Sequence, residues 1–221
     1  MFHTGEIRWF FKGTLPDEIR EWFESKGQGK QEPSRTDYYL LLPYCDTTSV
    51  KLSEGNLEVK ASTRRPEAVT YTNEVSGYRD AWVKWSCKAD DIDALTEMLG
   101  ATGDAWATIR KSRYLRKYSL DSVSPVEVNA ATARPESACQ VEISSLSVLT
   151  GKLDFPVSDT HWAAASPWWS IALEASAPGA AGVDVTSPLN DAADHFFRDK
   201  PPHRLSASSS MSYPAWLLKI A

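Results

Sequence analysis

The sequence predicts an α+β fold that is mainly antiparallel β: a tunnel-like barrel of about eight strands with helices packed outside it. Strand-like runs outnumber helical runs along the 221 residues. Several of these runs carry a lone charge on an otherwise small or polar face. Because successive strand side chains alternate faces, this pattern suits a closed sheet with a polar bore.

The strand–turn–strand segment at residues 48–62 shows this pattern most clearly. Lys51 and Ser53 project from one face before the turn, and Glu58 and Lys60 project from one face after it. The opposite face is apolar and consists of Val50, Leu52, Leu57 and Val59. Charges inside and apolar residues outside would suit a tunnel for a charged ligand. Taken alone, the segment is more typical of an ordinary hairpin with one wet face, and the recurrence of the pattern along the chain is what favours a tunnel.

Alternating and aromatic-rich runs predict the other strands. In chain order these are residues 6–12, 36–42, 81–87, 106–114, 116–123, 138–146 and 168–176. Residues 31–35 are predicted to form a loop, and Pro43 is predicted to stop the strand at 36–42. A turn-rich connection is predicted at 64–77, with a short strand at 68–71. Residues 126–137 contain Ala, Thr and Pro, and are predicted to be a loop or insertion.

Capping residues and apolar spacing predict four helices. Pro16 suits the first turn of one that ends near Gly27. Residues 90–99 follow an Asp and precede a Gly, which predicts a second helix. Residues 187–198 have one apolar side, and a short terminal helix is predicted at 213–220.

Composition narrows the functional classes. The net charge is −5 and the isoelectric point is about 5.4, so bulk attraction to nucleic acid is not expected. Residues 1–221 contain no stretch of membrane-span length and no visible signal peptide, and we expect a single domain. The three cysteines form no Cys-x-x-Cys pair, so no disulfide framework or zinc site is suggested. A reducing cytoplasm is the simplest location.

The predicted inner-face charges are the candidate site. The cations are Arg8, Lys51, Lys60, Lys84, Lys111 and Arg113. The acids are Glu6, Glu58, Glu142 and Glu174. Cations gathered in a bore repel one another unless acids or an anion balance them, and a polyphosphate offers many acceptor oxygens. Carboxylates beside it would hold Mg²⁺ or Mn²⁺. For each residue, a solvated position on a half-exposed strand is the alternative.

The order of these motifs resembles that of the CYTH-like triphosphate tunnel metalloenzymes. The segments that carry the resemblance are 6–10, 51–60, 111–114, 141–143 and 172–174. The resemblance implies one CYTH-like domain over residues 1–221. It departs from the family pattern where Arg8 and Ala172 replace expected glutamates and Phe10 replaces an expected lysine. A cation at Arg8 beside Glu6 disfavours a bound divalent ion.

Three functions remain in competition at this stage. The first is metal-dependent hydrolysis of a triphosphate or polyphosphate, with Glu6, Glu142 and Glu174 holding the metal and the six cations binding phosphate. The second is non-catalytic binding of a phosphorylated metabolite or another polyanion. The third is a structural or interaction protein whose strand charges are solvated. The sequence does not determine the oligomeric state.

Overall fold

The computed structural model describes residues 1–25, 27, 29–88, 105–119, 125–130, 138–150, 157–178 and 184–221. The strands are β1 (Phe2–Lys12), β2 (Lys30–Leu40), β3 (Thr48–Ser53), β4 (Asn56–Ser62), β5 (Glu67–Thr72), β6 (Val75–Lys88), β7 (Trp106–Ser119), β8 (Glu127–Val128), β9 (Ala138–Leu149) and β10 (Ser166–Pro178). The helices are α1 (Asp17–Ser25), α3 (Asp159–Ala163), α4 (Thr186–Phe196), α5 (Tyr213–Ile220) and the 3-10 helix η3 (Ala207–Ser209).

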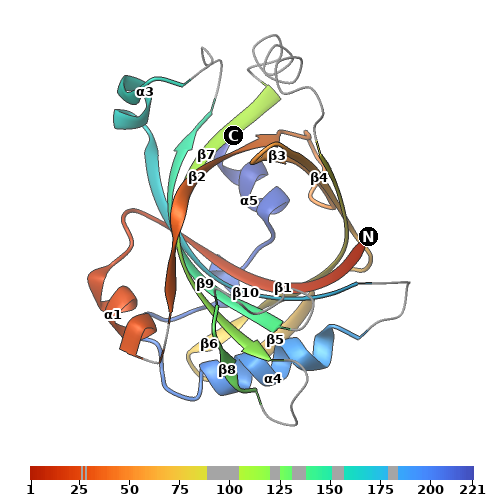
Figure 1. The fold of residues 1–221 in the computed structure, drawn as a ribbon, viewed down its shortest axis with the longest axis vertical. Helices are drawn as coiled ribbons and strands as arrows, with labels where there is room; N and C mark the ends of the chain where they lie inside the picture. Colours follow the sequence, from red (N-terminus) through yellow and green to blue (C-terminus); the bar gives the residue numbers. More distant parts are fainter. Residues whose placement is uncertain are drawn as a thin grey trace.

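Eight of the strands close into a ring (Figure 1). They follow the order β1-β10-β9-β7-β2-β3-β4-β6, and β6 then pairs with β1. All of these pairings are antiparallel. Strand β5 pairs with the first part of β6, and β8 pairs with β7. The predicted fold class is therefore confirmed: an antiparallel barrel of eight strands accompanied by helices.

The hairpin predicted at residues 48–62 is present as β3 and β4. Its two turn residues, Glu54 and Gly55, have φ values of 50° and 73°. Left-handed conformations at both positions match the right-handed twist of the flanking strands, as in a type I′ turn. Because the turn is this tight, Lys51 lies directly opposite Glu58 in the register. The turn thus places a cation and an acid on the same face.

Helices cover the outward faces of β1, β9 and β10. The apolar outward residues Ile7, Val141, Ile143, Ile171 and Leu173 are fully buried. They pack in one cluster with residues from α1 and α4, namely Ile19, Phe23, Leu189 and Phe196. Figure 1 shows both helices outside the ring. The barrel is therefore apolar on the outside of these strands, where the helices pack, which leaves its inner faces for polar side chains.

Helix α5 packs on inward-facing residues near one end of the barrel. Ser212 caps it by accepting a hydrogen bond from the Ala215 backbone N–H, at 3.3 Å. Trp216 stacks on Phe10 of β1, with the ring centroids 4.3 Å apart. The rest of this cluster is Tyr39, Ala107, Ile109, Leu146, Val148 and Leu217. The helix was predicted from the sequence, but its position on the inner faces was not.

Three boundaries differ from the sequence prediction. Residues 31–35 belong to β2, where the register shifts between Glu32 and Arg35. This irregularity accommodates Pro33, which cannot donate a ladder hydrogen bond. The two strands predicted at 106–114 and 116–123 are one strand through Ser119. Within 126–137, two residues form β8 and 131–137 lie outside the described residues.

The helix predicted at 90–99 also lies outside the described residues. No helix in the described part of the chain has the length and apolar character needed to cross a membrane.

Candidate functional site: a charged cavity in the barrel

A cavity of about 450 Å³ lies inside the barrel. All ten charged residues that the sequence analysis placed on the inner face line it, and their roles as ligands remain predictions. These residues are Glu6, Arg8, Lys51, Glu58, Lys60, Lys84, Lys111, Arg113, Glu142 and Glu174. They converge because each occupies an inward position on its strand. These charged side chains therefore face one cavity inside the barrel and not its outer surface.

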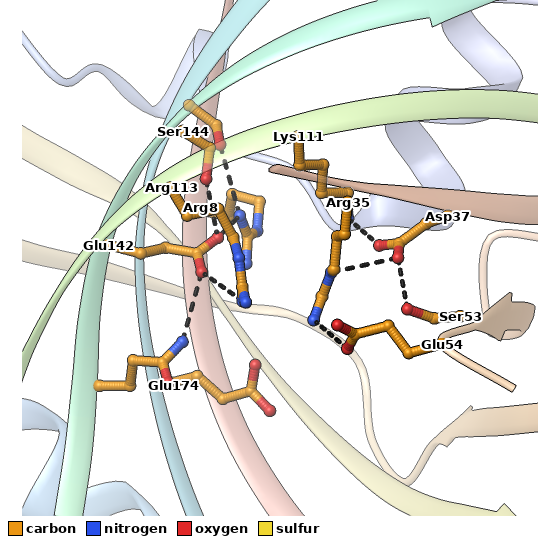
Figure 2. Close-up of polar contacts among 12 residues, drawn as sticks. Arg8, Arg35, Asp37, Ser53, Glu54, Lys111, Arg113, Glu142, Ser144 and Glu174 are labelled. Atoms are coloured by element: carbon orange, nitrogen blue, oxygen red, sulfur yellow. Dashed lines mark hydrogen bonds and ion pairs between the residues drawn. The ribbon is translucent and has the colours of Figure 1, made fainter. Parts of the chain in front are cut away.

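Glu142 on β9 is held by two arginines (Figure 2). Arg8 Nη1 lies 2.6 Å from Glu142 Oε1, and Arg113 Nη1 lies 3.7 Å from Oε2. Ser144 and Gln140 also donate to this carboxylate, at 3.2 and 3.3 Å. Burial opposes ionisation of Glu142, but the two guanidinium groups outweigh it and lower its pKa to about 2. The Glu142 carboxylate is therefore charged, and two cations share it.

Asp37 on β2 is held in the same way by Arg35 and Lys111 (Figure 2). Lys111 Nζ lies 2.8 Å from Asp37 Oδ2, and Arg35 Nε lies 3.2 Å from Oδ1. Ser53 donates a further hydrogen bond to the Asp37 carboxylate, and Lys111 donates to the Tyr39 hydroxyl at 2.7 Å. Burial lowers the pKa of Lys111 to about 8, although Asp37 opposes that effect.

Sequence reasoning missed Arg35, Asp37 and Tyr39. Residues 31–35 were predicted to be a loop, so Arg35 was not considered as a strand residue. The signal that could have found these residues is their alternation, because positions 35, 37 and 39 share one face of a strand.

Glu58 on β4 also contacts two cations, Lys51 across the hairpin and Lys84 on β6 at 2.7 Å. Burial opposes ionisation of Glu58, but the two ammonium groups lower its pKa to about 2. Burial lowers the pKa of Lys51 to about 8. The groups centred on Glu142, Asp37 and Glu58 each place two cations on one carboxylate, and we call them the two-cation clusters. The Glu142 and Glu58 clusters each carry one surplus positive charge, whereas Arg35 of the Asp37 cluster also contacts Glu54, at 3.4 Å.

A fourth group of charged side chains has more acids than cations. Asp80 on β6, Glu6 on β1 and Glu174 on β10 lie directly opposite one another in the register, and we call them the acidic row. Lys60 Nζ contacts Glu6 at 3.0 Å and Glu174 at 3.4 Å. Burial, reinforced by the nearby Glu6, raises the pKa of Asp80 to about 7. Sequence reasoning also missed Asp80, although it shares the alternation of Lys84 along β6.

The three acids predicted to hold Mg²⁺ or Mn²⁺ do not fit that role as they stand. Glu142 is bound to two arginines, while Glu6 and Glu174 share the Lys60 ammonium group. A divalent ion at any of these carboxylates would meet an adjacent side-chain cation. Within the described residues, no three acidic, His or Cys side chains are grouped so as to hold a metal ion.

The fold and the site together define a closed antiparallel barrel whose bore is lined by charged side chains. No family model matches the chain, and no curated protein matches it.

Solved structures with a similar outline include three with very low sequence identity. One is an adenylyl cyclase candidate from Hippeastrum with a dominant triphosphatase activity, which is 9% identical, with a TM-score of 0.44, covering 100% of this chain and 96% of that one. A protein from Pyrococcus horikoshii OT3 is 12% identical, with a TM-score of 0.43 and 99% of both chains covered. A conserved hypothetical protein from Pyrococcus furiosus is 11% identical, with a TM-score of 0.41, covering 95% and 98%. At this level of similarity, the chemistry of the site has to be argued from its own residues.

Proposed function

We propose that this protein binds a small molecule carrying several phosphate groups in the bore of its barrel, without a protein-held metal ion. The observation that carries the proposal is the set of three two-cation clusters around one cavity. The Glu142 and Glu58 clusters each have one cation more than acids, and the cations of the Asp37 cluster line the same cavity. A phosphate chain offers negative charges at successive positions, so it can meet several of these clusters at once.

The charge balance around the cavity favours an anion. The lining cations are Arg8, Arg35, Lys51, Lys60, Lys84, Lys111, Arg113 and Lys117. The lining acids are Glu6, Glu54, Glu58, Glu142 and Glu174. Cations remain in excess among the described residues here even when the buried Asp37 and Asp80 are added to the acids. The chain as a whole has a net charge of −5, so this excess is local to the bore.

The chemistry of the cations favours phosphate over a simple halide or a single carboxylate. Arginine presents a planar fork of donors that matches two phosphate oxygens, and lysine supplies a compact charge. Arg113 and Arg8 stand at one carboxylate, and Lys51 and Lys84 stand at another. Because each acid keeps a partner when one of its cations turns toward a ligand, binding need not leave a buried carboxylate unpaired.

The metal-dependent hydrolase is the alternative that the family resemblance implies. The contacts of Glu6, Glu142 and Glu174 with basic side chains favour the binding function over it. A phosphorylated metabolite and inorganic polyphosphate share the chemistry that the cavity would recognise.

The test is calorimetric titration of tripolyphosphate into the protein in a buffer that contains a chelator of divalent ions. We expect saturable binding of one ligand per chain, and weaker binding at higher salt because screening reduces the attraction. Absence of binding would overturn the proposal. Release of inorganic phosphate that depends on Mg²⁺ or Mn²⁺ would also overturn it, in favour of the hydrolase.

Arg113→Ala provides the matched variant. We expect it to weaken tripolyphosphate binding about 10- to 100-fold, because a hydrogen bond to a charged group contributes about 1.5–3 kcal/mol. The domain should stay folded, since Glu142 keeps its 2.6 Å contact with Arg8. Arg110→Ala is the control on the same strand: its guanidinium lies 4.1 Å from the ring centroid of Trp162 on α3 and does not line the cavity. If both variants bind alike, the bore is not the binding site.

A further inference from the structure

Three carboxylates stand side by side on three neighbouring strands of the barrel. Asp80, Glu6 and Glu174 are direct cross-strand neighbours, so their side chains share the inner face. Like charges at this spacing repel, and a cation normally resolves the conflict. Mg²⁺ and Mn²⁺ prefer oxygen ligands, but with Lys60 in place these carboxylates do not form a metal site.

The cation beside this acidic row is a side chain of the protein itself. Lys60 belongs to β4, where it lies opposite Lys84 of β6 in the register. Its side chain nevertheless reaches past β6 to Glu6 on β1 and Glu174 on β10. Lys84 instead contacts Glu58, at 2.7 Å. Two lysines that start from paired positions therefore have different partners, and Lys60 alone contacts the acidic row among the described residues.

The surroundings of Lys60 hold its charge in place. Burial by itself lowers a lysine pKa, but Glu174 and Glu6 outweigh burial and raise the pKa of Lys60 well above its ordinary value. Asp80 is buried, with 4% of its surface exposed, and makes no side-chain hydrogen bond or ion pair with the other described residues. Lys60 therefore contacts two of the three carboxylates of the acidic row, and the third is Asp80.

We propose that the Lys60 ammonium group is a built-in cation that occupies the place of a divalent metal ion at the acidic row, and thereby excludes Mg²⁺ and Mn²⁺ from the bore. The lysine provides one positive charge on a tether, where a metal ion would provide two and would need oxygen ligands free of other cations. Neutralising Lys60 then converts the acidic row into a metal site. This inference concerns the metal alone and does not depend on which anion the bore binds.

The experiment measures Mn²⁺ binding by electron paramagnetic resonance in a buffer free of phosphate. In the presence of the wild-type protein we expect the full signal of aqueous Mn²⁺. Lys60→Met should remove about one equivalent of Mn²⁺ from that signal, and Lys60→Met combined with Glu174→Gln should restore it. The control is Lys84→Met, which removes one positive charge from the paired position but leaves the Lys60 contacts intact.

Each measurement in this experiment either supports the proposal or overturns it. Binding of Mn²⁺ by the wild-type protein that is lost in Glu174→Gln would overturn the proposal, and so would a Lys60→Met protein that is folded and binds no Mn²⁺. Equal binding by Lys60→Met and Lys84→Met would reduce the effect to bulk charge and would also overturn it. If Lys60→Met does not fold, Lys60→Gln gives the same readout, because it removes the charge but keeps an amide donor for Glu6 and Glu174. Failure of tripolyphosphate binding would leave these outcomes unchanged, so the two proposals can fail separately.

Discussion

Two groups of charges in the same bore have opposite compositions. The Glu142 cluster places two arginines on one acid, whereas the acidic row places one lysine among three acids. They meet on β1, where Glu6 of the acidic row and Arg8 of the Glu142 cluster are two residues apart. Across β1, β10 and β9, Arg8 is opposite Ala172, and Ala172 is opposite Glu142. Ala172 lies on β10, between the strands that carry Arg8 and Glu142. Its small side chain leaves room for the Arg8 side chain to reach Glu142.

This difference shows how few residues decide whether such a bore favours cations or anions. Glutamates in place of Arg8 and Ala172 would make the Glu142 region resemble the acidic row. With arginine and alanine at these two positions, Glu142 is a single carboxylate in contact with two guanidinium groups. The part of the bore that we propose binds an anion and the part that we propose excludes metal ions therefore lie in neighbouring rows of one wall.

The largest effect is expected when Glu142 loses its near partner. Arg8→Met leaves the buried Glu142 carboxylate with Arg113 at 3.7 Å as its remaining basic contact among the described residues. Breaking a buried ion pair from one side costs about 3–5 kcal/mol. We expect the free energy of unfolding to fall by that amount in urea denaturation at pH 7. A loss below about 1 kcal/mol would mean that the Arg8 contact is not the one that holds Glu142.

Removing an acid from the acidic row should instead increase the free energy of unfolding. The folded-state pKa of Asp80 is about 7, above its ordinary value of 3.8. The folded protein therefore binds this proton more tightly than the unfolded chain, and ionised Asp80 lowers stability increasingly from about pH 4 to pH 7. Asp80→Asn should remove this cost and stabilise the protein above pH 7, by at most about 4 kcal/mol at 1.36 kcal/mol per pKa unit.

Urea denaturation at several pH values measures this effect. The advantage of Asp80→Asn over the wild-type protein should grow between pH 4 and 7 and stay constant above. A variant with the same advantage at pH 4 and pH 8 would show that Asp80 does not titrate as described.

The lysines of the two-cation clusters predict how anion binding depends on pH. Burial lowers the pKa values of Lys51 and Lys111 to about 8, so both lose their charge as the pH rises from 7 to 9. Because the anion favours the protonated lysines, affinity for tripolyphosphate should fall by up to about tenfold over this interval for each of the two lysines that contacts the ligand. Calorimetric titration at pH 7, 8 and 9 measures it. Constant affinity would show that these two lysines do not bind the ligand.

The smallest effect is expected at the edge of the Asp37 cluster. Glu54 lies on the β3–β4 turn, with 66% of its side chain exposed, and contacts Arg35 at 3.4 Å. Exposed ion pairs contribute about 0–1 kcal/mol, so Glu54→Gln should change the free energy of unfolding by less than 1 kcal/mol. The same change removes a negative charge from the cavity lining and should strengthen tripolyphosphate binding slightly. Weaker binding would mean that Glu54 positions Arg35 for the ligand.

Local sequence pattern is enough to predict how side chains alternate along the strands and which charged residues, in most cases, line the bore. A strand has a period of two, so local spacing is enough to place Lys51 with Glu58 and to separate them from Val50 and Val59. The hairpin, the first helix and the closing helix follow from turn and capping residues in the same local way. Arg35 escaped this reasoning because Pro33 obscures the first part of its strand, and Asp37 escaped it although it lies in the strand predicted at 36–42.

Which charged side chains contact one another depends on the pairing of strands that are distant in the sequence. Closing the ring brings β6 against β1, and this pairing sets Asp80 beside Glu6 although 74 residues separate them in the chain. The reach of Lys60 past its own neighbour to the acidic row, and the packing of α5 on the inner faces, likewise depend on the register of distant strands. Register and closure are set by contacts between remote segments, so local periodicity predicts which side chains point inward but not which partners they find there.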